Sequence, residues 1–157
     1  MRKSTQRRIK ERLENKPRCF IDASVFVEIL LKQRHSEKCL DFLHRIKCNY
    51  RIVTSTTAMG EVIKAIISED VSIRRLLFMG LDDLAGMASL IIFPISFESI
   101  SNVNAIRLSD SLVPSSDCLI FSSAFTEGCD TFATMDRHFS AQLGREFHIQ
   151  IENPSKN

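Results

Sequence analysis

The stretch CFIDASVFVEILL, from Cys19 to Leu31, is a nearly unbroken apolar run that carries a carboxylate at Asp22. Its first residues predict a buried strand, and the residues after Asp22 predict a helix. Removing a lone aspartate from water is costly unless a partner pairs with it or a cation binds it. We therefore expect the Asp22 carboxylate to have either a structural partner or a ligand that requires an oxygen anion.

Short runs rich in β-branched residues alternate with longer helical periods along the rest of the chain. The expected strands are Cys19–Ala23, Arg51–Thr54, Leu90–Ile95, Thr131–Met135 and Phe147–Ile151. The expected helices are Ser24–Lys32, Glu37–Lys47, Thr57–Ser68, Ser72–Met87, Phe97–Ser109 and Ser115–Glu127, with a short turn at Arg137–Leu143. Several strands are apolar on both faces, which is typical of parallel sheets covered by helices. The sequence predicts a three-layer α/β/α sandwich around a central, mainly parallel, twisted sheet of about five strands.

Charge divides the chain of 157 residues into two parts. The net charge is +2, but residues 1–18 contain eight Lys or Arg and two Glu, so the remainder is slightly acidic. We expect a basic arm over residues 1–17 and one compact domain over residues 18–157. A basic arm suggests contact with a polyanion, although charge alone favours the ordinary alternative of a solvated terminus.

The cysteines and the hydropathy pattern indicate a protein of the cytoplasm. Five cysteines without a CxxC pair are typical of buried thiols in a reducing compartment. The basic start leads into further charged residues and not into the apolar core of a signal peptide. The run Cys19–Leu31 is too short to span a bilayer and contains Asp22 and Glu28, so we expect no membrane association.

Acidic residues occur at four positions where an amphipathic pattern does not require them. Asp22 and Asp136 end expected strands, and each has a hydroxyl residue two positions away, on the same side. Glu61 follows the second strand, and Asp117 begins an apolar helix. Because the carboxyl ends of parallel strands meet at one edge of a sheet, we expect these side chains to converge there. The candidate catalytic residues are Asp22, Ser24, Glu61, Asp117, Thr134 and Asp136.

Each carboxylate also has an ordinary structural interpretation. Asp117 lies at a helix start, where the helix dipole favours an acid. Asp136 is placed to cap the following turn, and Glu61 to pair with Lys64 on a solvated face. Asp22 has the weakest such alternative, because the end of a buried strand offers little contact with water.

Four carboxylates at one place repel one another, and a divalent cation removes that repulsion. The predicted metal ligands are Asp22, Glu61, Asp117 and Asp136, a set of oxygen donors that favours Mg²⁺ or Mn²⁺ over Zn²⁺. Acidic Mg²⁺ sites with bound water usually act on phosphate groups. No glycine-rich nucleotide loop and no serine or cysteine hydrolase triad is recognisable in the sequence.

Four segments, in order and spacing, resemble the PIN-domain ribonucleases, especially the VapC-like toxins. They are FIDASVFVEILL, TSTTAMGEVIKAI, SDCLIFSSA and GCDTFATMDRHF, and the resemblance extends from about Cys19 to the C-terminus. It implies RNA as substrate, Mg²⁺ or Mn²⁺ as cofactor, and products with 5′-phosphate and 3′-hydroxyl ends. It further implies Ser24 and Thr134 as hydroxyls that support metal or water, and Asp130 as a structural residue. Ser116, where the family often has a small apolar residue, departs from the common pattern.

The leading hypothesis is a metal-dependent endoribonuclease that hydrolyses RNA phosphodiester bonds. By the resemblance, the toxin role implies a homodimer and a small antitoxin protein whose tail enters the acidic site. Two alternatives stay open: a stand-alone RNA-processing nuclease, and a catalytically inactive PIN-like module that binds RNA or a protein partner.

Overall fold

A computed structural model describes residues 16–156, which fold around a sheet of five strands whose pairings are all parallel. The strands are β1 (Arg18–Ile21), β2 (Arg51–Ser55), β3 (Ile91–Phe93), β4 (Thr131–Ala133) and β5 (Gln150–Glu152). They lie side by side in the order β3-β2-β1-β4-β5. The predicted fold class is therefore confirmed. The basic arm expected over residues 1–17 lies almost entirely outside the described residues.

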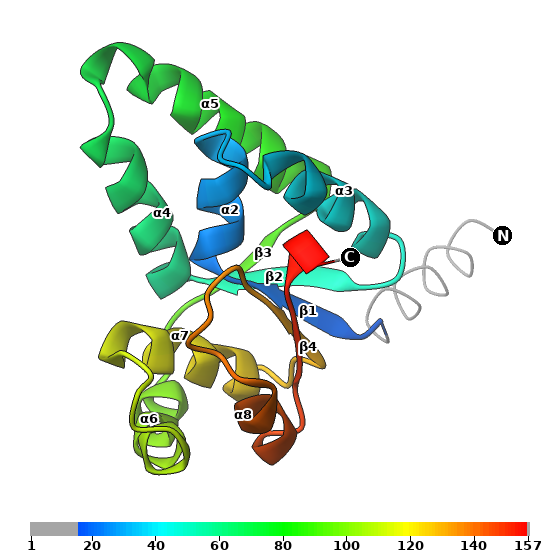
Figure 1. Cartoon of the computed structure of the whole chain (residues 1–157), viewed down its shortest axis with the longest axis vertical. Coiled ribbons are helices and arrows are strands. Elements are labelled where there is room, and N and C mark those ends of the chain that lie inside the picture. Colours follow the sequence, from blue (N-terminus) through cyan, green and yellow to red (C-terminus); the bar gives the residue numbers. More distant parts are fainter. Residues whose placement is uncertain (1–15, 157) are drawn as a thin grey trace, which may run out of the picture.

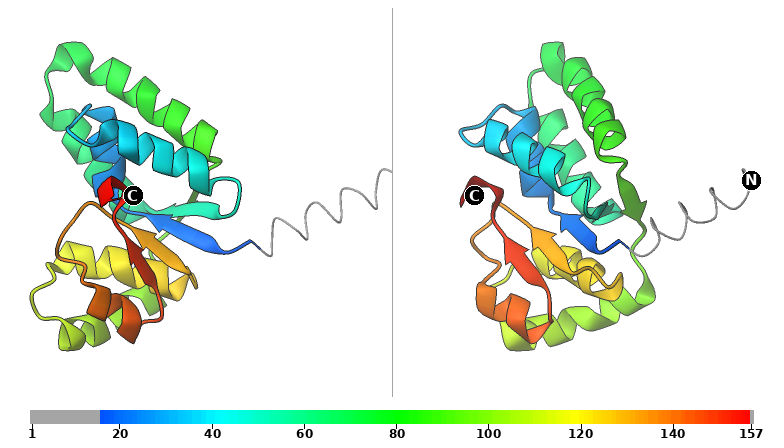
Figure 2. Two further views of the ribbon diagram at one scale, coloured as in Figure 1. Left: turned by 45° about the vertical axis from the view of Figure 1, so that its right-hand side comes forward. Right: turned by 90° about the vertical axis from the view of Figure 1, so that its right-hand side faces the viewer.

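Helices cover both faces of the sheet and complete the three layers (Figures 1 and 2). One face carries α2 (Ala23–Leu30), α3 (Ser36–Ile46), α4 (Thr56–Ser68) and α5 (Val71–Ala88). The other face carries α6 (Phe97–Ser109), α7 (Ser115–Thr126) and α8 (Ala141–Glu146). A single 3₁₀ turn, η1 (Pro154–Lys156), follows β5. Within residues 16–156, no helix combines the length and apolarity needed to cross a membrane.

The strand order creates a topological switch point between β1 and β4. From β1 the chain adds β2 and β3 on one side, and then returns to add β4 and β5 on the other. The helices after β1 and after β4 therefore leave the sheet in different directions, which opens a crevice at the carboxyl ends of these two strands. Ligands of open parallel sheets bind in such a crevice.

Phenylalanine rings fill the space between the sheet and the α7 side. Phe20 on β1 and Phe132 on β4 are register partners whose rings stack with centroids 5.3 Å apart. Phe121 on α7 meets the Phe132 ring edge-on at 5.2 Å, and all three side chains are fully buried. This packing fixes α7 against the central strands, and it thereby fixes the position of Asp117 in the first turn of α7.

The two expected elements nearest the C-terminus are displaced in the structure. The chain does turn at Arg137, as expected, but the turn is shorter than residues 137–143, because α8 begins at Ala141, where the Ser140 hydroxyl accepts a hydrogen bond from the Leu143 amide at 3.1 Å. The strand expected at 147–151 begins three residues late. Phe147 instead packs its ring between α7 aromatics, and His148 turns the chain with a φ of 56°. Pro94 directly follows the edge strand β3.

Candidate metal centre

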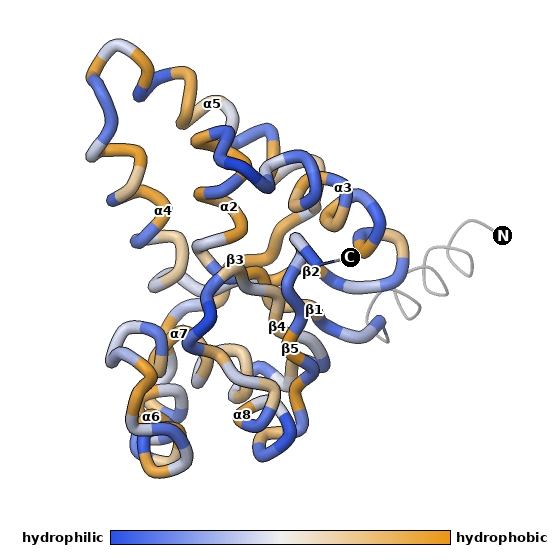
Figure 3. Tube along the Cα trace, in the orientation of Figure 1, coloured by the Kyte–Doolittle hydropathy of each residue, from blue (hydrophilic) through white to orange (hydrophobic). Residues whose placement is uncertain are grey.

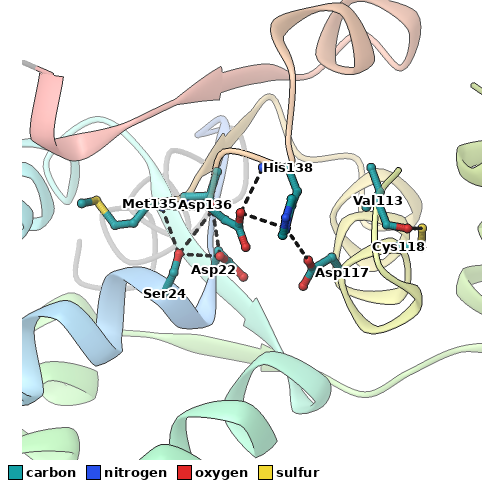
Figure 4. Close-up of polar contacts among 9 residues, drawn as sticks. Asp22, Ser24, Val113, Asp117, Cys118, Met135, Asp136 and His138 are labelled. Carbon is teal, nitrogen blue, oxygen red and sulfur yellow. Dashed lines mark hydrogen bonds and ion pairs between the residues drawn. The ribbon is translucent and has the colours of Figure 1, made fainter. Parts of the chain in front are cut away.

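Asp22 joins the end of β1 to the start of α2 at the switch point. Its amide donates to the carbonyl of Ala133 at 2.9 Å, which extends the pairing of β1 with β4 by one bond. The residue is the N-cap of α2, yet its side chain makes no capping hydrogen bond to that helix. The carboxylate is only 4% exposed and points into the crevice with the other labelled polar residues (Figure 4).

Two hydroxyl groups hold the Asp22 carboxylate in place. Ser24 donates to Oδ2 at 2.5 Å, and Thr134 donates to the same oxygen at 2.8 Å. The hydroxyls also accept backbone bonds, Ser24 from the Met135 amide and Thr134 from the Asp136 amide, both at 3.0 Å. The network therefore ties the ends of β1 and β4 together around one buried oxygen. Burial raises the pKa of Asp22, and the two hydroxyl donors partly offset this rise.

Asp117 and Asp136 face each other across the imidazole of His138. The His138 Nδ1 lies 3.0 Å from Oδ1 of Asp136 and 3.4 Å from Oδ2 of Asp117 (Figure 4). One ligating atom from each of the three residues lies within 4.8 Å of the others, a spacing that a single metal ion can bridge. Burial raises the pKa of Asp117, and the nearby carboxylates of Asp136 and Asp22 raise it further.

Glu61 reaches the same crevice from the second turn of α4, which begins where Ser55 caps the helix after β2. Burial raises the pKa of Glu61, and the charges of Asp22 and Asp117 add to this rise. A hydrogen bond from Ser116 and the charge of Lys64 both lower it. The expected pairing with Lys64 is thus a minor influence, and the serine that departs from the family pattern contacts this acid.

The structure therefore brings all six candidate residues to one edge of the sheet. The structural interpretation of Asp136 also has a basis, because its Oδ1 accepts the His138 amide at 3.0 Å in a local turn. That turn does not begin α8, and it leaves the second carboxylate oxygen for another partner. Asp130 lies outside the crevice, and its Oδ2 accepts the Arg18 amide at 2.9 Å, which agrees with the structural role that the resemblance implied.

His138 is the residue that the sequence analysis did not assign to the site. The sequence contained one indication of this role: His138 lies two residues after Asp136, and the same spacing links Thr134 to Asp136. A histidine without a recognisable partner carries little information in a single sequence, and only the folded turn places it between two carboxylates. Three raised pKa values and a shared ligand spacing fit a divalent cation. The donors are carboxylate oxygens with one imidazole, which suits Mg²⁺ or Mn²⁺ and gives Mn²⁺ an additional donor.

Comparison with protein families supports the resemblance seen in the sequence. A family model described as the PIN domain matches residues 19–142. The chain belongs to the PIN-domain family. The match spans all four acidic residues and both supporting hydroxyls. A comparison with curated proteins found no match.

Three of the solved structures that the chain resembles are described next. The chain resembles VapBC2 from Rickettsia felis bound to a DNA fragment from their promoter, with a TM-score of 0.68 and 17% identity over 86% of this chain and 97% of that chain. For FitAcB from Neisseria gonorrhoeae the TM-score is 0.67 and the sequence identity 17%, over 87% of this chain and 97% of that chain. For DNA-bound VapBC from Salmonella typhimurium the TM-score is 0.62 and the sequence identity 15%, over 88% of this chain and 98% of that chain. At these identities the likeness establishes the fold.

Thr134→Val tests whether the hydroxyl network stabilises the buried carboxylate of Asp22. Valine keeps the shape of threonine but removes the donor to Asp22 and the acceptor for the Asp136 amide. We expect the metal-free protein to lose about 1–3 kcal/mol of unfolding free energy. Thr134→Ser keeps the hydroxyl and is the matched control. Urea denaturation measures both variants, and equal losses in the two would show that methyl packing and not the hydroxyl matters.

The raised pKa values predict an unusual dependence of stability on pH in the presence of a chelator. The pKa values of Asp22, Glu61 and Asp117 are raised on folding, so the folded protein binds protons more tightly than the unfolded chain. This contribution is fully present below about pH 4, where these groups are protonated when unfolded, and is lost as pH rises through the folded values.

Asp117→Asn isolates this effect, because it removes one carboxylate of the cluster. We expect the wild-type free energy of unfolding to fall more steeply than that of the variant between about pH 4 and neutrality. At neutral pH, excess Mn²⁺ should raise the unfolding free energy of the wild type above that of the variant, because metal binds the ionised folded state. Parallel slopes with and without Mn²⁺ would contradict the assignment of a metal centre.

Proposed function

We propose that this chain is a divalent-metal-dependent endoribonuclease that hydrolyses RNA phosphodiester bonds. The observation that carries the proposal is the convergence of four carboxylates, three of them with raised pKa values, at the switch point of a PIN fold. Nothing in the described crevice other than His138 Nδ1 is placed to neutralise Asp117 and Asp136. A cation is therefore the natural partner of this site.

In this proposal, some residues of the site bind the metal and others orient its ligands. Asp22, Asp117 and Asp136 would hold Mg²⁺ or Mn²⁺, and Glu61 would hold a second ion or orient the attacking water. Bound metal supplies charge stabilisation for the phosphoryl oxygens and makes water a better nucleophile. Ser24 and Thr134 fix the orientation of the Asp22 carboxylate through the hydrogen bonds described above. By family resemblance, the products carry 5′-phosphate and 3′-hydroxyl ends.

We further propose residues 18–157 as the nuclease domain and residues 1–17 as a basic arm that adds non-specific affinity for RNA. The toxin of a toxin–antitoxin pair is the biological role we favour, because several solved structures with this fold are VapBC or FitAB assemblies. The alternatives are a stand-alone RNA-processing nuclease and a catalytically inactive module that binds RNA or a protein partner.

Cleavage of a labelled RNA in the presence of Mn²⁺ tests the enzymatic proposal. We expect Asp22→Asn and Asp117→Asn each to lower the rate by about 100-fold or more, because metal-dependent stabilisation of the transition state is worth several kcal/mol. Asp82→Asn removes an exposed carboxylate on α5 and is the matched control, with unchanged rate expected.

The outcomes separate the hypotheses. Equal cleavage by the wild type and both site variants would point to a contaminating nuclease and end the proposal. Absence of cleavage, together with RNA affinity that a chelator does not change, would favour the inactive binding module. Circular dichroism of each variant checks that Asp22→Asn remains folded, since loss of folding would mean that Asp22 serves structure and not metal binding.

Two apolar surfaces support the expected protein partners. On the α4–α5 hairpin, Val71 is 73% and Leu76 is 66% exposed, and apolar positions recur along both helices (Figure 3). On α6, Phe97 is 85% and Leu108 is 89% exposed. Exposed apolar side chains grouped in this way mark interaction surfaces. We assign the hairpin surface to the antitoxin and the α6 surface to a second copy of the chain.

Reciprocal variants test this assignment by sedimentation of the chain alone and with the product of any short reading frame found immediately upstream of its gene. Leu76→Glu should weaken the heterocomplex at least about tenfold and leave the dimer intact, because a buried unpaired carboxylate is costly. Leu108→Glu should weaken the dimer and leave the heterocomplex intact. A monomeric wild type would contradict the dimer, and absence of such a neighbouring gene would favour the stand-alone nuclease.

A further inference from the structure

A second cavity opens at the amino ends of the strands, the opposite end of the sheet from Asp22. Its volume is about 540 Å³, within the range of small-molecule sites. The start of β2 and the connection that precedes it form one wall, and the last turn of α5 and the start of β3 form the other. In Figure 1 this region lies where α3 leads into β2, away from the crevice between α4 and α7.

The lining of this cavity is cationic. Lys16, Lys47 and Arg51 all contribute to it, and none of the described residues that line it is acidic. The Lys16 Nζ donates to the carbonyl of Cys48 at 2.7 Å, which anchors the first described residue of the chain to the wall of the cavity. Three positive charges around one opening favour an anionic ligand, and the planar guanidinium of Arg51 suits a phosphate group.

The remaining lining is apolar and aromatic. Met87 and Ile91 are half-buried on one wall, and the half-buried Tyr50 lies on the other. Tyr50 also lines an adjoining cavity of about 360 Å³, where Arg45 is a further cation and Glu152 is an acid. An aromatic residue with cations on both sides is the arrangement on which nucleic-acid bases stack while their phosphates pair with lysine and arginine.

We propose that this cavity binds a nucleotide, with its phosphate at Lys16, Lys47 and Arg51 and its base against Tyr50. The ligand chemistry is a phosphorylated nucleoside, which is available either as a free mononucleotide or as one residue of an RNA strand. The inference does not depend on RNA cleavage, because the cavity and the acidic crevice lie at opposite ends of the strands. If the chain is a ribonuclease, the cavity is a second contact for its substrate.

Cys48 makes occupancy of the cavity measurable without an activity assay. It lines the cavity and is exposed, whereas the other four cysteines of the chain are buried. The rate at which a maleimide reagent labels Cys48 in the full chain, with chelator present so that RNA is not cut, reports access to the site. Cys48→Ala establishes that labelling occurs at this thiol alone.

The competitors are adenosine and uridine monophosphates, a single-stranded RNA, and inorganic phosphate. We expect nucleotide or RNA to slow labelling, and the protection by RNA to weaken as salt rises. Protection by RNA alone identifies a strand as the source, and protection by the monophosphates identifies free nucleotides. Both results support a nucleotide site. No protection by either, or equal protection by inorganic phosphate, would overturn it.

Variants distinguish specific contacts from general attraction to a positive surface. Tyr50→Leu keeps apolar bulk but removes the stacking ring, and it should raise the half-protecting concentration about fivefold or more. Lys47→Ala with Arg51→Ala should also reduce the salt dependence. Arg75→Ala, which removes an exposed cation near the other end of α5, is the matched control. Equal effects of all these changes would refute the proposed contacts.

The result is separable from the nuclease proposal. RNA that protects Cys48 but is not cut by the wild type with Mn²⁺ would support the cavity and contradict the enzymatic function. RNA that is cut without protecting Cys48 would support the enzymatic function and contradict the cavity.

Discussion

The hydrogen bonds from Thr134 and Ser24 to one oxygen of Asp22 are the interaction on which the candidate centre depends. A carboxylate that is 4% exposed must be satisfied by neighbours, since water cannot do so. The donors come from the segments that follow β1 and β4, and they meet because these two strands are neighbours in the sheet. The two hydroxyls satisfy Oδ2, and the other carboxylate oxygen is available to a cation.

The same network determines where the other acids lie. The Thr134 hydroxyl accepts the Asp136 amide, so the backbone that carries Asp136 is fixed by the group that binds Asp22. Stacked phenylalanines on β1 and β4 fix α7, which carries Asp117. Repulsion among the carboxylates is therefore imposed by rigid elements and not relieved by movement. Burial raises the pKa values of Asp22, Glu61 and Asp117, and neighbouring carboxylates raise those of Glu61 and Asp117 further. Shifts of this kind are typical of functional sites, and they support the proposal that a divalent cation binds here.

Much of this arrangement could be predicted from the sequence, because strand ends in a parallel sheet meet at one edge whatever the details of the loops. This rule predicts the positions of Asp22 and Asp136, which follow strands directly. Glu61 and Asp117 lie on helices, and their placement at the same edge rests on the shared pattern of acids. The position of α8 could not be predicted, because it depends on the Phe147 ring packing against α7 and on the left-handed φ of His148. His138 was missed for a similar reason: the geometry of one turn, and not its spacing, directs its imidazole between two acids. The sequence of a long periodic segment predicts its own structure, whereas the structure of a short turn depends on the tertiary contacts around it.

Parallel strands also separate the charges of this protein. Carboxylates gather at the carboxyl edge, while Lys16, Lys47 and Arg51 lie around the amino ends of β1 and β2. In the proposed function, the acidic edge repels RNA until cations neutralise it, and the cationic residues at the amino ends would supply affinity for this polyanion. β2 has five residues, which corresponds to roughly 16 Å between its ends, and one strand of RNA can contact both. The proposed nucleotide site, placed away from the proposed metal centre, would let affinity and cleavage be set by different residues.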